Sequence, residues 1–368
     1  MKKTESSYNK SNIKALKLRT IQPQVAWGGR PLSGYNTNLL ALFDHEFVLV
    51  TGTGFTYIEN SSVHTRKAFI VEPHSTDIAK ILCICAAKEG KYVAAVAKTA
   101  HEERNQLYIV VYNTHNHMQD NVKPHEIKYT ANINFDHGDP LEARGVAFSP
   151  DCSLLACITN HPHIGVVVFD HFKGDLYQTI PTDALPISIS FHPLDPGKIC
   201  VTGECNFVKL WRFTNKSVHA APVSNLKRGF YSYICHNWVP PYAEGILVVG
   251  TDGGFLATIQ NCEQRAHAQQ VFGKLDSYDP SQNAVAHILI RGDIVIAASV
   301  SNQIAVFEVR RVLSAKGVGG LTATLVPLAF YSLENTTRIY GLQFCAKESN
   351  TSYTLMASTA DTLAFLDM

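Results

Sequence analysis

Carboxylates and glycines occur at three places where their spacing could serve chemistry. The run NFDHGDPLE, residues 134–142, holds two aspartates and a glutamate. A glycosidase needs two such groups facing each other across a pocket, and proximity in sequence does not provide that. The turns GTGF (52–55) and GTDGGF (250–255) could cradle a phosphate, yet each lies between two β-rich runs and neither precedes the Lys-Ser/Thr pair of a P-loop. We therefore expect a solvated loop at the first place and hairpin turns at the other two.

The nine cysteines could bind a metal or act as nucleophiles. Cys83 and Cys85 lie in one β-rich run, and we expect their thiols on opposite faces of that strand. Two further pairs, neither accompanied by a second pair at zinc spacing, are Cys152 with Cys157 and Cys200 with Cys205. No Gly-x-Ser-x-Gly element occurs, and scattered Ser, His and Asp residues do not define a triad. We predict buried free thiols in a reducing compartment, with no catalytic residue, metal or cofactor.

Opposite charges nearly cancel over the 368 residues, with 32 Lys and Arg against 31 Asp and Glu. This balance argues against nucleic acid or a membrane as a partner. In addition, no apolar run approaches the roughly 18 residues of a membrane helix. The N-terminus is the exception, because six basic residues there accompany a single acid, Glu5. These candidate contacts for an acidic surface are Lys2, Lys3, Lys10, Lys14, Lys17 and Arg19.

A pair of β-rich runs joined by a turn recurs seven times along the chain. The first runs are 47–52, 92–98, 154–160, 198–203, 246–252, 294–300 and 354–359. Their partner runs are 55–60, 107–113, 164–170, 207–213, 255–260, 303–309 and 362–368. Equivalent points in successive copies are 44 to 63 residues apart, and a period of roughly 40 to 50 residues is typical of propeller blades. Segments 113–126 and 314–323 fill the two longer gaps, and we expect both to be surface loops.

Four aromatic residues are candidates for structural positions. Phe148 and Phe191 each stand two residues before a proline, which ends a buried strand and begins a turn. Trp211 lies in the run FVKLWRF, where a large apolar side chain would pack between blades. We expect Trp238 to be structural as well.

Together these patterns predict an all-β protein, a single seven-bladed β-propeller of degenerate WD repeats with a short basic N-terminal extension. Residues 1–15 would form a flexible basic tail, and residues 16–368 the propeller. The seventh copy lacks an outer strand, and the run LKLRTIQP (16–23) is free to supply it. Such pairing would close the ring and remove an open sheet edge.

Three stretches are more specific than a general propeller pattern. They are AFSPDCSLLACIT (147–159), SFHPLDPGKICVTGECNFVKLWRF (190–213) and CHNWVPPYAEGILVVGTDGGFLATIQNCEQR (235–265). These stretches resemble the first WD-repeat propeller of the cilia- and flagella-associated protein family. Members of that family typically carry two propellers and a long coiled coil that lies along a doublet microtubule. This sequence has repeats for one propeller and no heptad segment, so it is either a compact relative or part of a longer product.

The resemblance implies a non-catalytic scaffold of the ciliary or flagellar axoneme, within the cytoplasm and cytoskeleton. The implied partners are tubulin, other cilia- and flagella-associated proteins, and components of the inner dynein arm or regulatory complex. Two alternatives stay open: a cytosolic β-propeller adaptor in a non-ciliary complex, and a propeller hydrolase with a central pocket. Retention on detergent-extracted axonemes separates the first two, whereas carboxyl groups with shifted pKa values converging on a dry pocket would favour the hydrolase.

Overall fold

A computed structural model gives the arrangement of most of the chain. The residues that it describes are 13–15, 19–20, 38–43, 46–51, 54–59, 67–71, 78–99, 106–114, 125–130, 142–160, 164–214, 217–224, 226, 231–240, 245–264, 266–273, 279–313, 321–333, 338–344, 354–359 and 363–367. Within these ranges, no helix is both long enough and apolar enough to cross a membrane.

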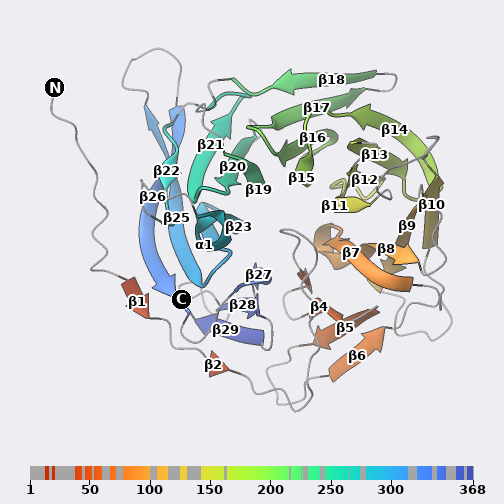
Figure 1. The fold of residues 1–368 in the computed structure, drawn as a ribbon, viewed down its shortest axis with the longest axis horizontal. Helices are drawn as coiled ribbons and strands as arrows, with labels where there is room; N and C mark the ends of the chain where they lie inside the picture. Colours follow the sequence, from red (N-terminus) through yellow and green to blue (C-terminus); the bar gives the residue numbers. More distant parts are fainter. Residues whose placement is uncertain are drawn as a thin grey trace.

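Seven β-sheets stand around a common axis in the described part of the chain, which is the arrangement of a β-propeller (Figure 1). The prediction of an all-β, seven-bladed propeller is therefore confirmed. Blade 1 consists of β3 (Leu39–Phe43), β4 (Glu46–Thr51), β5 (Gly54–Glu59) and β6 (Lys67–Val71). Blade 2 consists of β7 (Ile78–Ala86), β8 (Tyr92–Thr99), β9 (Gln106–Asn113) and β10 (His125–Thr130), with the 3-10 turn η2 (Lys88–Gly90) after β7.

The middle of the chain forms the next three blades. Blade 3 consists of β11 (Ala143–Phe148), β12 (Leu154–Thr159), β13 (Gly165–Asp170) and β14 (Asp175–Pro181). Blade 4 consists of β15 (Pro186–His192), β16 (Asp195–Gly203), β17 (Val208–Thr214) and β18 (Ser217–Pro222). Blade 5 consists of β19 (Tyr233–Val239), β20 (Ile246–Thr251), β21 (Phe255–Gln260) and the short β22 (Gln269–Gln270).

The last two blades contain strands from both ends of the chain. Blade 6 consists of β23 (Val285–Arg291), β24 (Ile294–Ser299), β25 (Gln303–Leu313), β26 (Leu321–Ser332) and β1 (Ile13–Ala15), and the helical turn α1 (Pro280–Asn283) precedes it. Blade 7 consists of β27 (Gly341–Phe344), β28 (Thr354–Ser358), β29 (Leu363–Asp367) and β2 (Arg19–Thr20). The seven pairs of runs found in the sequence correspond to the second and third strands of the seven blades.

The hydrophobic core lies between neighbouring blades rather than within one of them. Seven clusters of buried side chains each join two adjacent blades, and the cluster of Leu39, Phe47, Leu49 and Met356 joins blade 7 to blade 1. Because both faces of a blade are covered, its middle strands carry continuous apolar runs, and β20 and β21 are buried along their whole length.

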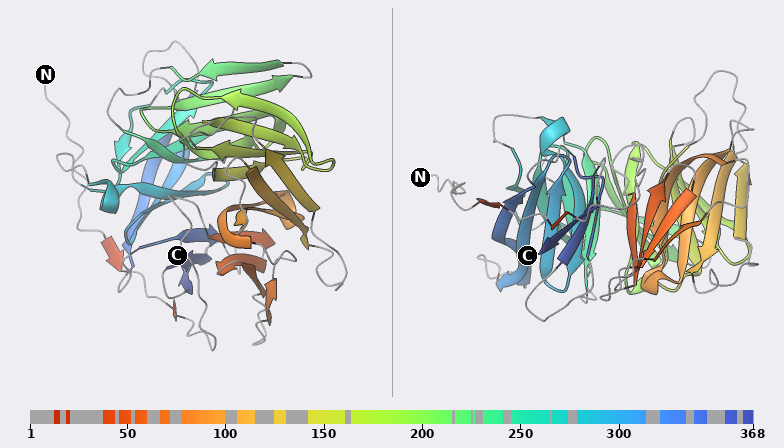
Figure 2. Two further views of the ribbon diagram at one scale, coloured as in Figure 1. Left: turned by 45° about the vertical axis from the view of Figure 1, so that its right-hand side comes forward. Right: turned by 90° about the horizontal axis from the view of Figure 1, so that it is seen from below.

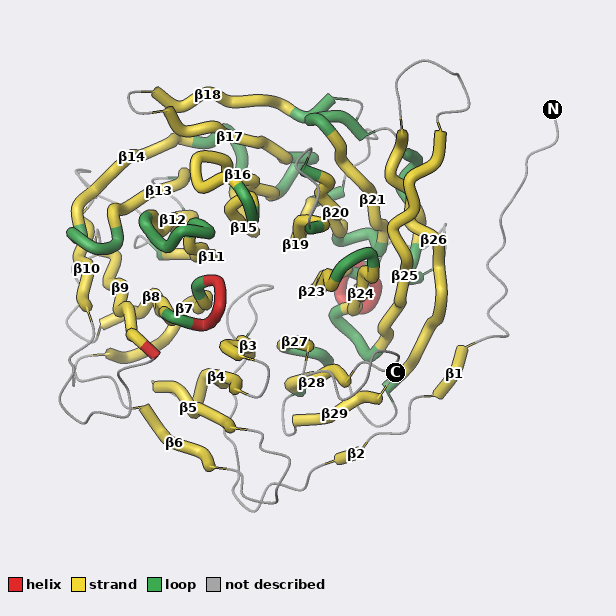
Figure 3. The backbone as a smooth tube through the Cα atoms, turned by 180° about the vertical axis from the view of Figure 1, so that it is seen from behind, coloured by secondary structure: helices red, strands yellow, loops and turns green. Residues whose placement is uncertain are grey.

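Each blade presents its turns on two opposite sides of the ring (Figure 2). Since consecutive strands are antiparallel, the turn from first to second strand and the turn from third to fourth strand lie on the same side, which we call face A. The loops that lead from one blade to the next lie on the other side, which we call face B. Seen from behind, the first strands of the blades surround the centre of the ring (Figure 3).

The hairpin of β25 and β26 is longer than the corresponding hairpins of the other blades. Its far end lies on blade 5, where Thr258 Oγ1 donates a hydrogen bond to Ala323 O at 2.9 Å and Gln269 Nε2 donates one to Leu325 O at 2.8 Å. The hairpin therefore contacts both β21 and the two-residue outer strand β22 of blade 5. The prediction that all of 314–323 is a surface loop was wrong, because β26 already begins at Leu321 and pairs there with Leu313.

Two short strands near the N-terminus pair with the last two blades. In β1, Ile13 pairs in parallel with Phe330 of β26, and in β2, Arg19 pairs in antiparallel register with Phe365 of β29. The fourth strand of blade 7 is therefore β2, which lies within the predicted closing run 16–23. Among the described residues, the first to pair with another strand is Ile13, so Ile13–Ala15 of the expected tail 1–15 belong to a sheet. Residues 1–12 lie outside the described ranges.

Candidate functional site between blades 4 and 5

A chain of polar side chains crosses the contact between blades 4 and 5. His236 of β19 lies between two hydroxyl groups, with Ser190 Oγ 2.7 Å from its Nε2 and Thr202 Oγ1 3.0 Å from its Nδ1. Trp238 Nε1, also on β19, donates a hydrogen bond to Ser190 Oγ at 2.9 Å. Strands β15 and β16 supply the two hydroxyls, so the chain links two strands of blade 4 to the first strand of blade 5.

The serine and histidine resemble part of a hydrolytic triad, but their surroundings give them a structural role. Burial lowers the pKa of His236 to about 3, so the ring is neutral near pH 7. A triad orients its imidazole with a carboxylate, whereas Thr202 presents a neutral hydroxyl. Trp238 also donates to Ser190 Oγ, so the polar side chains of Ser190, Thr202, His236 and Trp238 all have a partner within this network. A buried polar network needs such complete pairing to be stable.

Beside this chain, strand pairing aligns basic side chains on the blade-5 side of blade 4. Lys198 of β16 pairs with Arg212 of β17, which pairs with His219 of β18. Lys198 faces blade 5, since its Nζ lies 5.6 Å from the centre of the Trp238 ring. His192, at the end of β15, contacts the same ring edge-on at a centroid distance of 4.8 Å. The four residues form a row across blade 4 near face A, which we call the basic row.

The basic row borders a groove of about 490 Å³ that opens to solvent. His192, Lys198 and Arg212 line it together with Asp195. Its apolar lining comes from Leu194, Leu210, Trp211, Ala221 and Cys262. Leu194 stands in the turn between β15 and β16 and is 56% exposed, so a large apolar side chain marks the opening of the groove.

The positive charge of the groove comes from Lys198 and Arg212. Arg212 Nη2 lies 3.5 Å from Asp195 Oδ2, and the Arg212 side chain is 69% exposed. Lys198 has no ion-pair partner among the residues that the structure describes. Burial lowers the pKa of His192, and the nearby Lys198 adds to that effect, so this imidazole is mostly neutral near pH 7.

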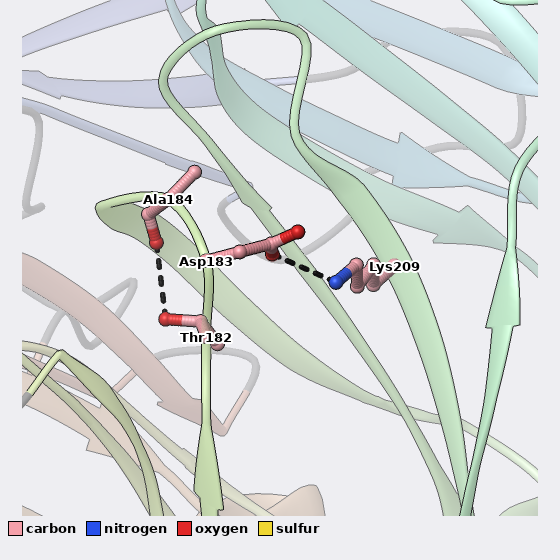
Figure 4. Close-up of polar contacts among 4 residues, drawn as sticks. All are labelled: Thr182, Asp183, Ala184 and Lys209. Carbon is pink, nitrogen blue, oxygen red and sulfur yellow. Dashed lines mark hydrogen bonds and ion pairs between the residues drawn. The ribbon is translucent and has the colours of Figure 1, made fainter.

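A lysine on the other side of the same blade shows the contrast. Lys209 Nζ donates a hydrogen bond to Asp183 Oδ1 at 2.7 Å, and the two side chains point toward each other (Figure 4). That hydrogen bond lowers the pKa of Asp183. In the same loop, Thr182 Oγ1 donates to Ala184 O at 3.0 Å. Both lysines lie near an aromatic ring, Lys209 at 5.3 Å from the centre of Phe207 and Lys198 at 5.6 Å from that of Trp238. The difference is that Lys209 is paired with a carboxylate, whereas Lys198 has no carboxylate partner among the described residues.

The four aromatic residues expected to be structural are all buried. Phe148 lies in the cluster between blades 2 and 3, Phe191 and Trp211 lie between blades 3 and 4, and Trp238 lies between blades 4 and 5. Trp211 is only 4% exposed, although the edge of its ring also reaches the groove. Of the four, Trp238 is the one that belongs to the buried polar chain and also contacts Lys198 and His192 of the basic row.

The basic residues of the N-terminus are not brought to this groove by any described contact. Lys14 lies in β1 and Arg19 in β2, both known by their backbone pairing alone. The remaining members, Lys2, Lys3, Lys10 and Lys17, lie outside the described residues. Their contact with an acidic surface stays a prediction.

Other residues singled out for chemistry are placed as follows. The acidic run 134–142 lies outside the described residues except for Glu142, whose Oε1 is 3.8 Å from Lys98 Nζ. The turn after β20 is a hairpin turn, in which Asp252 accepts a hydrogen bond from Ser232 N at 3.0 Å. Among the described residues, no group of three His, Cys, Asp or Glu side chains is placed to hold a metal ion.

The expectation that Cys83 and Cys85 point to opposite faces was wrong. Residues two apart in a strand share a face, and both thiols pack in the cluster between blades 2 and 3, which also contains Cys157. Burial raises the pKa of all three thiols, so they are protonated near pH 7. All cysteines in the described ranges are free.

Sequence reasoning did not identify the basic row or the polar chain, because their members are far apart in the chain. Ser190 and Trp238 are separated by 48 positions. The available signal was the alternation of polar residues in SISFH (188–192), since a polar residue every second position marks one face of a strand. That signal predicts a polar face but does not identify which neighbouring blade carries the partners.

Comparison with solved structures supports the fold assignment. The chain is similar to the crystal structure of the RRP9 WD40 repeats, with 14% sequence identity and a TM-score of 0.60, covering 95% of this chain and 99% of that one. It is similar to the structure of U3-55K, with 14% identity and a TM-score of 0.58, covering 92% and 98%. The fold is a WD40-type β-propeller. No family model and no curated protein matches the sequence.

Proposed function

We propose that this WD40-type propeller is a non-catalytic scaffold that binds other proteins. A ring held by apolar clusters between all its blades keeps loops and grooves in fixed positions, which suits a surface for protein contacts. The observation that carries the proposal is the open groove between blades 4 and 5, where an exposed leucine and an arginine accompany a lysine without an ion-pair partner among the described residues. Arginine beside apolar side chains is typical of protein interfaces.

The finer proposal places this scaffold on the ciliary or flagellar axoneme. Its support is the resemblance of residues 147–159, 190–213 and 235–265 to the cilia- and flagella-associated proteins. On that proposal, the partners are tubulin and other axonemal proteins near inner-arm dynein or the regulatory complex. The basic residues at the N-terminus would add a salt-sensitive contact with an acidic surface.

Two measurements on the tagged full chain test these proposals. Cross-linking followed by mass spectrometry should yield reproducible cross-links to defined protein partners, and their absence would contradict the scaffold proposal. Extraction of cilia with detergent should leave the chain with the axonemes. A chain that forms cross-links in the cytosol but is absent from cilia would contradict the axonemal placement and favour the cytosolic adaptor.

A further inference from the structure

We propose that the groove between blades 4 and 5 binds an acidic peptide segment of a partner protein, with carboxylates next to an apolar side chain. This inference rests on the proposed scaffold function and names the kind of partner that the groove takes. Lys198 and Arg212 would bind the carboxylates, and Leu194 with the apolar lining would contact the neighbouring side chain.

The charges at the groove favour an anionic partner. Lys198 and Arg212 are adjacent across two strands, whereas Asp195 is the carboxylate that lines the groove with them. Arg212 approaches Asp195 at 3.5 Å, which is longer than the 2.7 Å between Lys209 and Asp183. The Arg212 side chain is also 69% exposed, so its guanidinium can reach a carboxylate of a partner as well. Lys198 has no carboxylate partner among the described residues that a bound peptide would have to displace.

The size and apolar lining of the groove favour a peptide over a free ion. A volume of about 490 Å³ falls within the range of about 300 to 1,000 Å³ that is usual for ligand sites. Leu194, at 56% exposure, stands beside the charges at the opening, while Leu210 and Ala221 lie on the strands behind them. A small anion would leave Leu194 exposed to water, whereas an apolar side chain of a peptide would cover it.

A nucleic acid fits this groove less well. Single-stranded nucleic acids bind proteins through exposed aromatic rings on which bases stack. Trp238 is only 5% exposed and is covered by His192 and Lys198, and Trp211 is 4% exposed. The aromatic rings near the groove are therefore closed to bases.

The binding test uses the full chain and a fluorescein-labelled peptide of alternating glutamate and leucine. A matched peptide has glutamine in place of each glutamate. We expect the glutamate peptide to bind and to weaken as salt rises, because the contacting charges are partly exposed. Lys198→Gln and Arg212→Gln should each weaken binding about threefold, and the double variant about tenfold, as is typical of exposed ion pairs.

Two further variants separate the groove from general charge effects. Asp195→Asn should strengthen binding about twofold, because it removes the carboxylate that competes for Arg212 while its amide oxygen can still accept from Gly197 N. Lys173→Gln is the matched control, since Lys173 is an exposed lysine on face A in the turn after β13, and it should leave binding unchanged. All variants should keep the melting temperature of the wild type.

Three results would overturn the inference: equal binding of the glutamine peptide, equal weakening by Lys173→Gln, or tighter binding of labelled oligothymidine than of the glutamate peptide. Failure of the groove is distinguishable from failure of the scaffold proposal. A chain that does not bind the glutamate peptide but gives cross-links to protein partners through other surfaces contradicts the groove alone. A chain with neither property contradicts both.

Discussion

Blades 3 and 4 meet through apolar side chains, whereas blades 4 and 5 meet at the equivalent positions through a hydrogen-bonded polar chain. Strand register defines the equivalence, because Phe148 pairs with Leu155 in blade 3 just as Phe191 pairs with Ile199 in blade 4. On this register, the first contact consists of Ala147, Ile158, Ile189 and Phe191. The second contact has Ser190, Thr202, His236 and Trp238 at the same four places.

The difference shows that one fold can join its blades by apolar packing, or by apolar packing combined with a buried polar network. An apolar contact depends on volume and shape, so neighbouring side chains can partly adjust to a change. A buried polar contact depends on each donor and acceptor having a partner, and loss of one group leaves others unsatisfied. The polar contact also lies beside the groove, because Trp238 belongs to the polar chain and contacts Lys198 and His192, two residues that line the groove. The wall of the candidate site is therefore held by directional bonds.

The largest expected effect is in the apolar contact. Trp211→Ala removes a side chain that is 4% exposed in the cluster between blades 3 and 4. Loss of a buried tryptophan costs about 3 to 5 kcal/mol, so we expect a large fall in the free energy of unfolding, measured by urea denaturation. Leu328→Ala is the control, because Leu328 is 51% exposed and should change stability little. An unchanged melting temperature for Trp211→Ala would contradict the packing role.

A smaller effect is expected in the polar contact. His236→Ile leaves the hydroxyl of Thr202 without its buried partner, whereas Ser190 Oγ keeps the hydrogen bond from Trp238 Nε1, and one unsatisfied group costs about 1 to 3 kcal/mol. We expect a loss of about 2 kcal/mol in urea denaturation, which is less than the loss for Trp211→Ala.

A combined variant tests the reason for that loss. Ser190→Ala, Thr202→Ile, His236→Ile and Trp238→Phe together would reproduce the apolar pattern of the contact between blades 3 and 4. None of these four side chains then carries an unpaired polar group, so we expect this variant to be more stable than His236→Ile alone. If the combined variant loses as much as the sum of its single changes, unsatisfied polar groups are not the cause.

The pH dependence of stability distinguishes the two contacts in the wild type. Burial lowers the pKa of His236 to about 3 in the folded chain, against an ordinary value of 6.5. The unfolded chain therefore binds the proton first, so stability is complete above the ordinary value and is lost as the pH falls toward the folded one. Each such histidine contributes a slope of about 1.4 kcal/mol per pH unit in that window.

The measurement is urea denaturation at pH values between about 5 and 7, where carboxylates stay ionised. His287, whose pKa burial lowers to about 4, adds a second slope of the same sign. We expect His236→Ile to remove one part of the slope and to leave the parts due to His287 and to His171 and His192, whose pKa values are also lowered by burial. An identical slope in wild type and His236→Ile would show that His236 is not buried in its neutral form.

The fold could be predicted from the sequence because its signal is repeated. Each second and third strand carries an alternating or continuous apolar run with a turn between, and an error in one copy does not hide the other six. The end of β25 and the start of β26 are different, because polar and glycine-rich residues around 314–323 look like a loop by composition. Leu313 and Leu321 nevertheless pair, and the same end of the hairpin binds Thr258 and Gln269 of blade 5, contacts that local composition does not reveal.

The candidate site could be predicted only in part. Trp211 and Trp238 were assigned structural positions from their strands, and both are buried. The basic row was not predicted, because cross-strand neighbours such as Lys198 and Arg212 follow from register, which a single sequence does not fix. His236 differs again, since its role depends on hydroxyls from two strands of another blade.

The smallest expected effect lies at ring closure, across the ring from both compared contacts (Figure 1). Deletion of residues 1–23 removes β1 and β2 and exposes the edges of β26 and β29. The pairing is short, and a backbone hydrogen bond contributes about 1 kcal/mol net, partly offset by the entropy of ordering the strand, so we expect a loss of about 1 kcal/mol and lower solubility. Because His236 lies far from this edge, the slope of stability with pH should not change. A truncated chain as stable and soluble as the full one would contradict closure by these strands, and a changed slope would show that closure and the polar contact are coupled around the ring.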